Sequence, residues 1–259
     1  MTVYRLVIEY DGARFSGWQK QPGQRTVQGV LETALETVLR KPGRLQGAGR
    51  TDAGVHALGQ TGSFETDSEI EPNRLRKGLT ALSRPDIAVV DAAVAPDGFN
   101  ARFDAVGKHY RYTVLNRSMP SPLFGGRSFF VPTPLDTERM RDAAALLVGR
   151  HDFSGFRSAD CERENTMRTL TKVAISKEGA LVHIDVEGTA FLKNMVRIIA
   201  GTLVDIGRGR FDVDRIREVL HTGDRRLAGQ TAPAHGLILV KVFYEEGWLR
   251  EKGQKAALR

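Results

Sequence analysis

A change in hydrophobic period near the start of the chain constrains its fold most strongly. Tyr4, Leu6, Ile8 and Tyr10 alternate with other residues, and this two-residue period predicts a strand over 1–11. From Val27 to Leu39 the apolar residues recur at helical spacing, with Thr26 as an N-cap and Pro42-Gly43 beyond the end. A strand followed by an amphipathic helix indicates that sheet and helix pack on each other.

The same kinds of pattern continue along the chain. A glycine-rich stretch over 43–62 is interpreted as irregular. The next helix is expected over 72–83, burying Leu75, Leu79 and Leu82 and ending before Pro85. Further strands are expected over 87–94, 108–115, 170–176, 181–187 and 237–244, and further helices from Asp136 to Leu147 and over 191–204 and 212–221.

This order predicts an α+β fold of two similar α/β halves. The element order is ferredoxin-like, and the halves are expected to contribute a mostly antiparallel extended sheet with helices packed on it. The division is predicted as residues 1–105, residues 106–247 and a polar tail over 248–259.

Composition narrows the class of protein. The formal net charge is +7, from 38 Lys plus Arg against 31 Asp plus Glu, which favours a polyanionic partner such as nucleic acid but is weak evidence alone. A single cysteine, Cys161, excludes an intramolecular disulfide and a cysteine-based zinc cluster. The start has no secretion-type segment and no apolar run is long enough to span a bilayer, so we expect a cytoplasmic protein.

The segment from Gly47 to Ala57 is the most informative stretch. Three glycines and several alanines surround one carboxylate, Asp52, and small residues let a backbone come close to a ligand. The segment lacks the Gly-Lys-Ser/Thr ending of a P-loop and the third glycine of a dinucleotide-binding turn. Composition alone favours a surface turn in which Asp52 caps the local backbone.

Several blocks across the chain resemble one known family. Gly49-Arg50-Thr51-Asp52-Ala53-Gly54-Val55-His56-Ala57 resembles the signature of tRNA pseudouridine synthases of the TruA type. Further blocks resemble other motifs of that family, in the family's order, at residues 10–12, 15, 17–21, 99–103, 110–112, 191–197 and 232–237.

The resemblance implies a specific activity. Members convert uridine to pseudouridine at positions 38, 39 and 40, in the anticodon stem-loop of tRNA. They use no metal or organic cofactor, act as homodimers, and bind RNA in a cleft between their halves. The resemblance therefore implies tRNA and a second copy of the chain as partners, with no membrane and no metal.

The resemblance also assigns roles to four residues. The family's invariant catalytic aspartate matches Asp52, and the arginine that pairs with it matches Arg197. The tyrosine that packs against the target base matches Tyr110, and the arginine thought to help extrude that base matches Arg50.

The chemistry suits these residue types. Pseudouridylation breaks the N1–C1′ bond, turns the uracil and rejoins it through C5, so nothing is added or lost. A carboxylate can trap the electron-poor sugar or act as a base, whereas glycoside hydrolysis normally uses two carboxylates. Attack on C1′, addition to C6 and removal of the C2′ proton all remain open for Asp52. A paired arginine would keep such a carboxylate ionised in a dry pocket.

Other interpretations stay open at this point. Lys193, Asn194 and Arg197 could form a solvent-facing stripe on their helix, and Tyr110 could pack in a sheet. His56 fits loop structure or RNA contact better than metal binding. Two other functions, a noncatalytic RNA-binding protein and an RNA hydrolase, are disfavoured by the single carboxylate of the glycine-rich loop.

Overall fold

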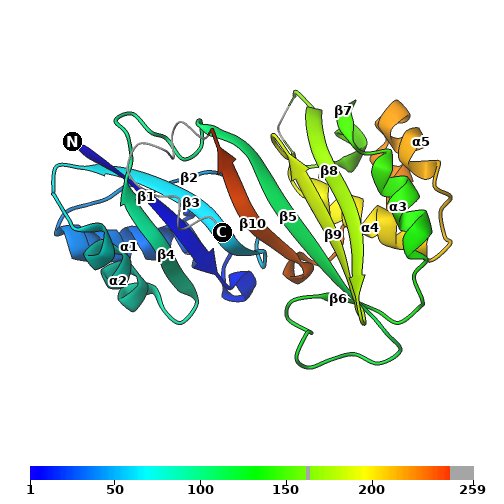
Figure 1. Ribbon diagram of the computed structural model, residues 1–259, viewed down its shortest axis with the longest axis horizontal. Helices are drawn as coiled ribbons and strands as arrows, with labels where there is room; N and C mark the ends of the chain where they lie inside the picture. The colour runs from blue at the N-terminus through cyan, green and yellow to red at the C-terminus, as the bar shows by residue number, and fades with distance from the viewer. Residues whose placement is uncertain (162–163, 246–259) are drawn as a thin grey trace. The chain divides into compact units, whose positions relative to one another are not determined.

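The computed structural model describes residues 1–161 and 164–245, and these form two compact units (Figure 1). Among the described residues, unit 1 comprises Met1–Gly107 and 239–245, and unit 2 lies within Lys108–Ile238. The mixed α+β class predicted from the sequence is confirmed, since each unit contains both strands and helices. The predicted tail, 248–259, lies outside the described residues.

The sheet of unit 1 has the strand order β4-β1-β3-β10, with β2 paired to β3. Strand β1 is antiparallel to both of its neighbours, β3 and β4. The bounds are β1 Thr2–Tyr10, β2 Gln46–Gly47, β3 His56–Thr66, β4 Ile87–Val94 and β10 Leu237–Tyr244.

Two helices, α1 (Val27–Leu39) and α2 (Pro72–Ser83), cover this sheet. Helix α1 begins as the sequence predicts, because the Thr26 hydroxyl accepts a hydrogen bond from Gly29 N. The core between helices and sheet contains fully buried side chains from each element, among them Leu6, Ile8, Leu31, Leu35, Leu75 and Leu79.

The sheet of unit 2 has the order β5-β9-β8-β7. These strands pair antiparallel, while the short β6 runs parallel to β5. The strand bounds are β5 Ala105–Asn116, β6 Phe129–Val131, β7 Gly149–Asp152, β8 Met167–Glu178 and β9 Leu181–Gly188. The helices are α3 Thr137–Ala145, α4 Met195–Gly207 and α5 Arg215–Thr222, and α3 packs on both α4 and β8.

Some elements differ from the sequence-based predictions. The stretch over 43–62, expected to be irregular, contains β2 and more than half of β3. Leu82 is 50% exposed rather than buried. The helix expected from Phe191 begins only at Met195, because Asn194 adopts a left-handed backbone with φ 60°. The strand expected over 237–244 is β10, which pairs with β3.

Candidate active site

Asp52 lies in a loop of unit 1, between β2 and β3, and is half-buried. The residue before it fastens this loop from two sides. The Thr51 carbonyl accepts a hydrogen bond from Trp18 N at 3.1 Å. The Thr51 hydroxyl is hydrogen-bonded to the buried Tyr10 hydroxyl at 2.8 Å. Because Tyr10 lies on β1, these bonds tie the position of Asp52 to the central strand of unit 1.

Two glycines let the segment after β1 pack directly on this loop. At Gly17, whose φ is +91°, a Cβ atom would lie 2.7 Å from the Thr51 carbonyl oxygen. At Gly12 a Cβ atom would lie 2.0 Å from the Val55 carbonyl oxygen. Real Cβ atoms do not approach other atoms so closely, so both positions require glycine. The backbone around Asp52 is therefore in contact with a second backbone segment.

Further bonds hold both ends of the loop. Gly54 N donates to the Phe15 carbonyl at 3.4 Å. The fully buried Gln60 donates through Nε2 to the Gly49 carbonyl at 3.0 Å. Val55 N closes a turn by donating to the Asp52 carbonyl at 3.1 Å. Neither Tyr10 nor Gln60 was predicted as a support of the loop. Tyr10 is distant from it in sequence, and no pattern in the sequence marks the bond from Gln60 to Gly49.

Burial makes Tyr10 a neutral support. Desolvation raises the pKa of its hydroxyl, and hydrogen bonds with Thr51 and Gln60 lower it only in part. The phenol therefore stays protonated at neutral pH and can hydrogen-bond without adding a negative charge near Asp52.

His56, at the start of β3, supports the loop by bonding to the segment that packs on it. Its side chain is 3% exposed, and Nδ1 accepts a hydrogen bond from Gly12 N at 3.0 Å. The same nitrogen lies 3.1 Å from Asp11 Oδ1. Of the two interpretations left open by the sequence, this burial favours a role in loop structure over contact with RNA.

Arg50 shares the loop with Asp52 but is exposed. Its Nε donates to Gln19 Oε1 at 3.1 Å. The structure thus places two of the residues assigned by resemblance, Arg50 and Asp52, on one loop of unit 1.

Arg197 lies in the first turn of α4, in unit 2. Its Nε donates to the Ala232 carbonyl at 2.8 Å, and Nη1 donates to Asn194 Oδ1 at 2.7 Å. Ala232 N in turn donates to the Arg197 carbonyl at 3.1 Å. The guanidinium therefore joins the start of the helix to the segment before β10. Lys193 precedes the helix and pairs with Asp160, so the expected helical stripe of polar residues does not form.

Tyr110 lies on β5 of unit 2 and is 7% exposed. The Phe191 ring packs edge-on against it, with 5.0 Å between the ring centroids. Tyr112, on the same strand, is fully buried and donates to the Pro233 carbonyl at 2.8 Å. Burial raises the Tyr112 pKa, although the nearby Arg197 charge acts in the opposite direction. Tyr110 and Arg197 therefore lie in the same unit, and Arg197 is near enough to the buried Tyr112 for its charge to affect the Tyr112 pKa.

The described residues hold neither a cluster of metal-binding side chains nor a membrane-spanning helix. Within 1–161 and 164–245, no three histidine, cysteine, aspartate or glutamate residues are grouped as a metal site would need. In the same residues, no helix combines the length and the apolar character that crossing a bilayer requires.

Comparisons with known proteins agree with the motifs. A family model described as tRNA pseudouridine synthase matches residues 6–104 and 143–245. A protein named tRNA pseudouridine synthase A from Geotalea uraniireducens (strain Rf4) is 48% identical, over 94% of this chain and 100% of its own length. Proteins of the same name from Myxococcus xanthus and Geobacter sulfurreducens (strain ATCC 51573 / DSM 12127 / PCA) are 47% and 45% identical, over 94% of this chain and 92% and 100% of theirs.

One solved structure, titled as a Cbf5-Nop10-Gar1 complex, aligns with 92% of this chain and 59% of its own. It has a TM-score of 0.34 and 11% identity, values too low to support an argument. The family model and the curated relatives each cover most of the chain. The chain therefore belongs to the tRNA pseudouridine synthase family, a family of isomerases that act on tRNA uridines.

Proposed function

We propose that this chain isomerises uridine to pseudouridine at positions 38, 39 and 40 in the anticodon stem-loop of tRNA, with Asp52 as the catalytic carboxylate. Family membership supports the reaction and the substrate class. The observation that carries the assignment of Asp52 is its loop, which backbone contacts fasten at Thr51 and Gly54 while Asp52 stays half-buried. A reacting carboxylate needs such a fixed position.

The reaction breaks the bond between N1 and C1′ and forms a bond between C1′ and C5. The proton of C5 is lost and N1 gains one, so the product has the same atoms as the substrate. Asp52 either attacks C1′, adds to C6 or removes the C2′ proton, and each of these steps requires its ionised form.

Three further residues support this step in the proposal. Arg197 supplies the positive charge that keeps Asp52 ionised once bound RNA excludes water. Tyr110 packs its ring against the target base, and such stacking contributes about 1–3 kcal/mol per base. Arg50 takes the place of the extruded base, which offsets part of the few kcal/mol needed to unstack it.

We also propose that the enzyme works as a homodimer in the cytoplasm, where its tRNA substrate is made. Light scattering at micromolar concentration tests the dimer, and a mass equal to that of one chain would contradict it.

The experiment that tests the function is incubation of unmodified tRNA with the protein, followed by chemical labelling that maps pseudouridine. We expect labelling at positions 38, 39 and 40, with the same yield in the presence of EDTA. Absence of any labelled position would contradict the proposed activity, and loss of activity in EDTA would contradict metal independence.

Two variants test the catalytic residue. Asp52→Ala should abolish tritium release from C5-labelled uridine in tRNA while the RNA still binds. The matched control is Asp97→Ala, since Asp97 is an exposed aspartate of the same unit, and it should retain full turnover. Measurable turnover by Asp52→Ala would refute the assignment.

A further inference from the structure

The first residues of α1 hold Gly17 and Trp18, in the segment that also contacts the Asp52 loop. The first N–H groups of a helix have no partner within the helix. Here Val27 N donates to the Gly17 carbonyl at 3.2 Å, and Gln28 N donates to the Trp18 carbonyl at 3.0 Å. The carbonyl groups of this segment therefore bond to the start of α1. Its Trp18 N donates to the Thr51 carbonyl of the Asp52 loop.

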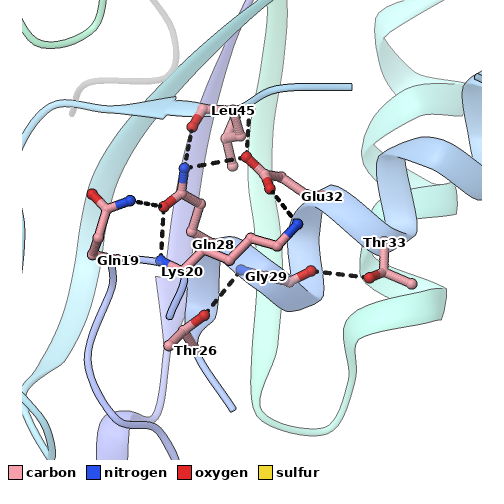
Figure 2. A network of polar contacts seen from close by, with 8 residues as sticks. All are labelled: Gln19, Lys20, Thr26, Gln28, Gly29, Glu32, Thr33 and Leu45. Atoms are coloured by element: carbon pink, nitrogen blue, oxygen red, sulfur yellow. Dashed lines mark hydrogen bonds and ion pairs between the residues drawn. The ribbon is translucent and has the colours of Figure 1, made fainter. Parts of the chain in front are cut away.

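The side chain of Gln28 extends this connection. It is a buried residue, 8% exposed. Its Oε1 accepts hydrogen bonds from Lys20 N at 2.9 Å and from Gln19 Nε2 at 2.8 Å. Its Nε2 donates to the Leu45 carbonyl at 3.0 Å and to Glu32 Oε1 at 3.2 Å. Figure 2 shows this network around the amide, which uses both of its donors and both of its acceptor positions.

Backbone groups fix the direction of these bonds. A backbone N–H such as that of Lys20 can only donate, and a carbonyl such as that of Leu45 can only accept. The Gln28 amide therefore has one orientation, with Oε1 toward Lys20 and Nε2 toward Leu45. Gln19 must then turn its NH₂ group toward Gln28 and its Oε1 away from it. That oxygen accepts the hydrogen bond from Arg50 Nε at 3.1 Å.

We propose that Gln28 and Gln19 are positioning residues for Arg50, which they hold in the orientation needed at the extruded base. The inference rests on the proposed function, since it takes the role of Arg50 from there. The bond to Nε restrains the guanidinium at its base and so limits the rotation of an otherwise exposed side chain. The Nη groups of Arg50 then face the bound RNA in a fixed direction.

A purely structural role for the Gln19 and Gln28 side chains predicts a different result. If Gln19 only stabilised the loop, its loss would reduce turnover equally whether or not Arg50 were present. If Gln19 acts through Arg50, its loss should have little effect once Arg50 is gone. A double-mutant cycle separates the two.

The cycle compares wild type, Gln19→Leu, Arg50→Ala and the double variant, in single-turnover assays with saturating protein and unmodified tRNA. We expect Gln19→Leu to lower the rate constant about tenfold in the wild-type background and less than about twofold beside Arg50→Ala. Equal losses in the two backgrounds would overturn the inference, as would full activity of Arg50→Ala.

Two further variants complete the test. Gln28→Glu keeps an acceptor for Gln19 but removes the donor to Leu45 and faces the carboxylate of Glu32, so it should lower the melting temperature while the rate constant falls less than with Gln19→Leu. A rate loss by Gln28→Glu that persists beside Arg50→Ala would also overturn the inference. Thr33→Val is the control, because the Thr33 hydroxyl bonds to the Gly29 carbonyl on the same helix without a link to Arg50, and its rate should be unchanged.

Failure of the inference is distinct from failure of the function. If the wild-type protein forms no pseudouridine, the proposed function fails and the inference falls with it. If the wild type is active and the cycle shows no coupling, the function stands and only the positioning role is lost.

Discussion

The two regions that carry the candidate site residues are held in different ways. In unit 1, the described anchors of the Asp52 loop are backbone groups and the side chains of Tyr10, His56 and Gln60. In unit 2, Arg197 is itself an anchor, because its guanidinium joins Asn194 to Ala232. In unit 1 the groups that hold the loop belong to residues other than the proposed catalytic Asp52. In unit 2 the charged side chain of Arg197, also a proposed site residue, is itself one of the holding groups.

Among changes outside the four proposed site residues, the largest effect should come from breaking the backbone contact in unit 1. Gly17→Ala places a Cβ atom 2.7 Å from the Thr51 carbonyl oxygen, so the loop must move. A displacement of about 1 Å can cost roughly a hundredfold in rate, and we expect a loss of that order in single-turnover assays.

Gly23→Ala is the matched control for this prediction. Gly23 has a similar positive φ, +68°, but no atom lies within 4 Å of the place that its Cβ would occupy. Gly23→Ala therefore introduces a similar backbone strain without placing a Cβ atom against a neighbouring atom. Equal rate losses in the two variants would show that strain, rather than contact with the Asp52 loop, is responsible.

The second prediction contrasts Arg197→Lys with Asp52→Asn. Lysine keeps the positive charge but cannot reproduce two bonds from a planar guanidinium. We expect Arg197→Lys to lower both turnover and the free energy of unfolding, the latter by roughly 1.5–3 kcal/mol for a lost charged hydrogen bond. Asp52→Asn keeps the size of the side chain but cannot act as a nucleophile or a base, so it should abolish turnover.

Urea unfolding measured beside the activity assay checks this pair. If Arg197→Lys unfolds like the wild type, Arg197 is not an anchor, and the contrast between the two regions disappears.

A smaller effect is expected from Tyr10→Phe, which removes the hydroxyl bonded to Thr51 and leaves the ring in place. A buried hydroxyl left without its partner costs about 1–3 kcal/mol of unfolding free energy. Because the backbone anchor from Trp18 to Thr51 remains, turnover should fall only a few-fold. A complete loss of turnover would mean that the side chain, rather than the backbone, holds the loop.

The smallest effect concerns a second charged group of unit 2. Burial raises the pKa of Asp185, but hydrogen bonds from His109 and Arg111 outweigh it and lower that pKa from 3.8 to about 2. The folded state therefore binds its proton less readily than the unfolded state does. The stabilisation is present above the unfolded pKa, near 3.8, and is lost as the pH falls through about 2.

Urea unfolding between these two pH values tests this. Wild-type stability should fall with decreasing pH more steeply than that of Asp185→Asn, which has no such carboxylate to protonate. Parallel curves would show that charged pairs contribute little to unit 2.

The helices were largely predictable from the sequence because their signals are local. The Thr26 cap and the apolar spacing after it give the bounds of α1, and Pro72 and Pro85 frame α2. The start of α4 was not predictable in this way, because the left-handed backbone of Asn194 leaves no trace in hydrophobic spacing. The apolar spacing of α2 does not show that Leu82 is exposed while Leu75 and Leu79 are buried.

Strand β3 was missed for a different physical reason. Its glycines and polar residues lower the apparent strand propensity, but a Cβ at Gly59 would lie 2.6 Å from the Val240 carbonyl oxygen, and one at Gly62 would meet Leu45. These glycines are required by neighbours that are distant in sequence. Asp52, Arg50, Tyr110 and Arg197 were identified by resemblance, and their roles stay predictions. Their supports, such as Tyr10 and Gln28, depend on long-range hydrogen bonds and became visible only in the structure.

Strand β10 pairs with β3, so unit 1 is completed by residues from the far end of the chain. During synthesis on the ribosome, Met1–Gly107 emerges long before Leu239 does. Until then the edge of β3 that later pairs with β10 is covered only where β2 pairs with it, at Gly62 and Ser63. The first unit can therefore be completed only after β10 has been translated, and a message truncated before β10 would yield a chain in which part of this edge stays unpaired.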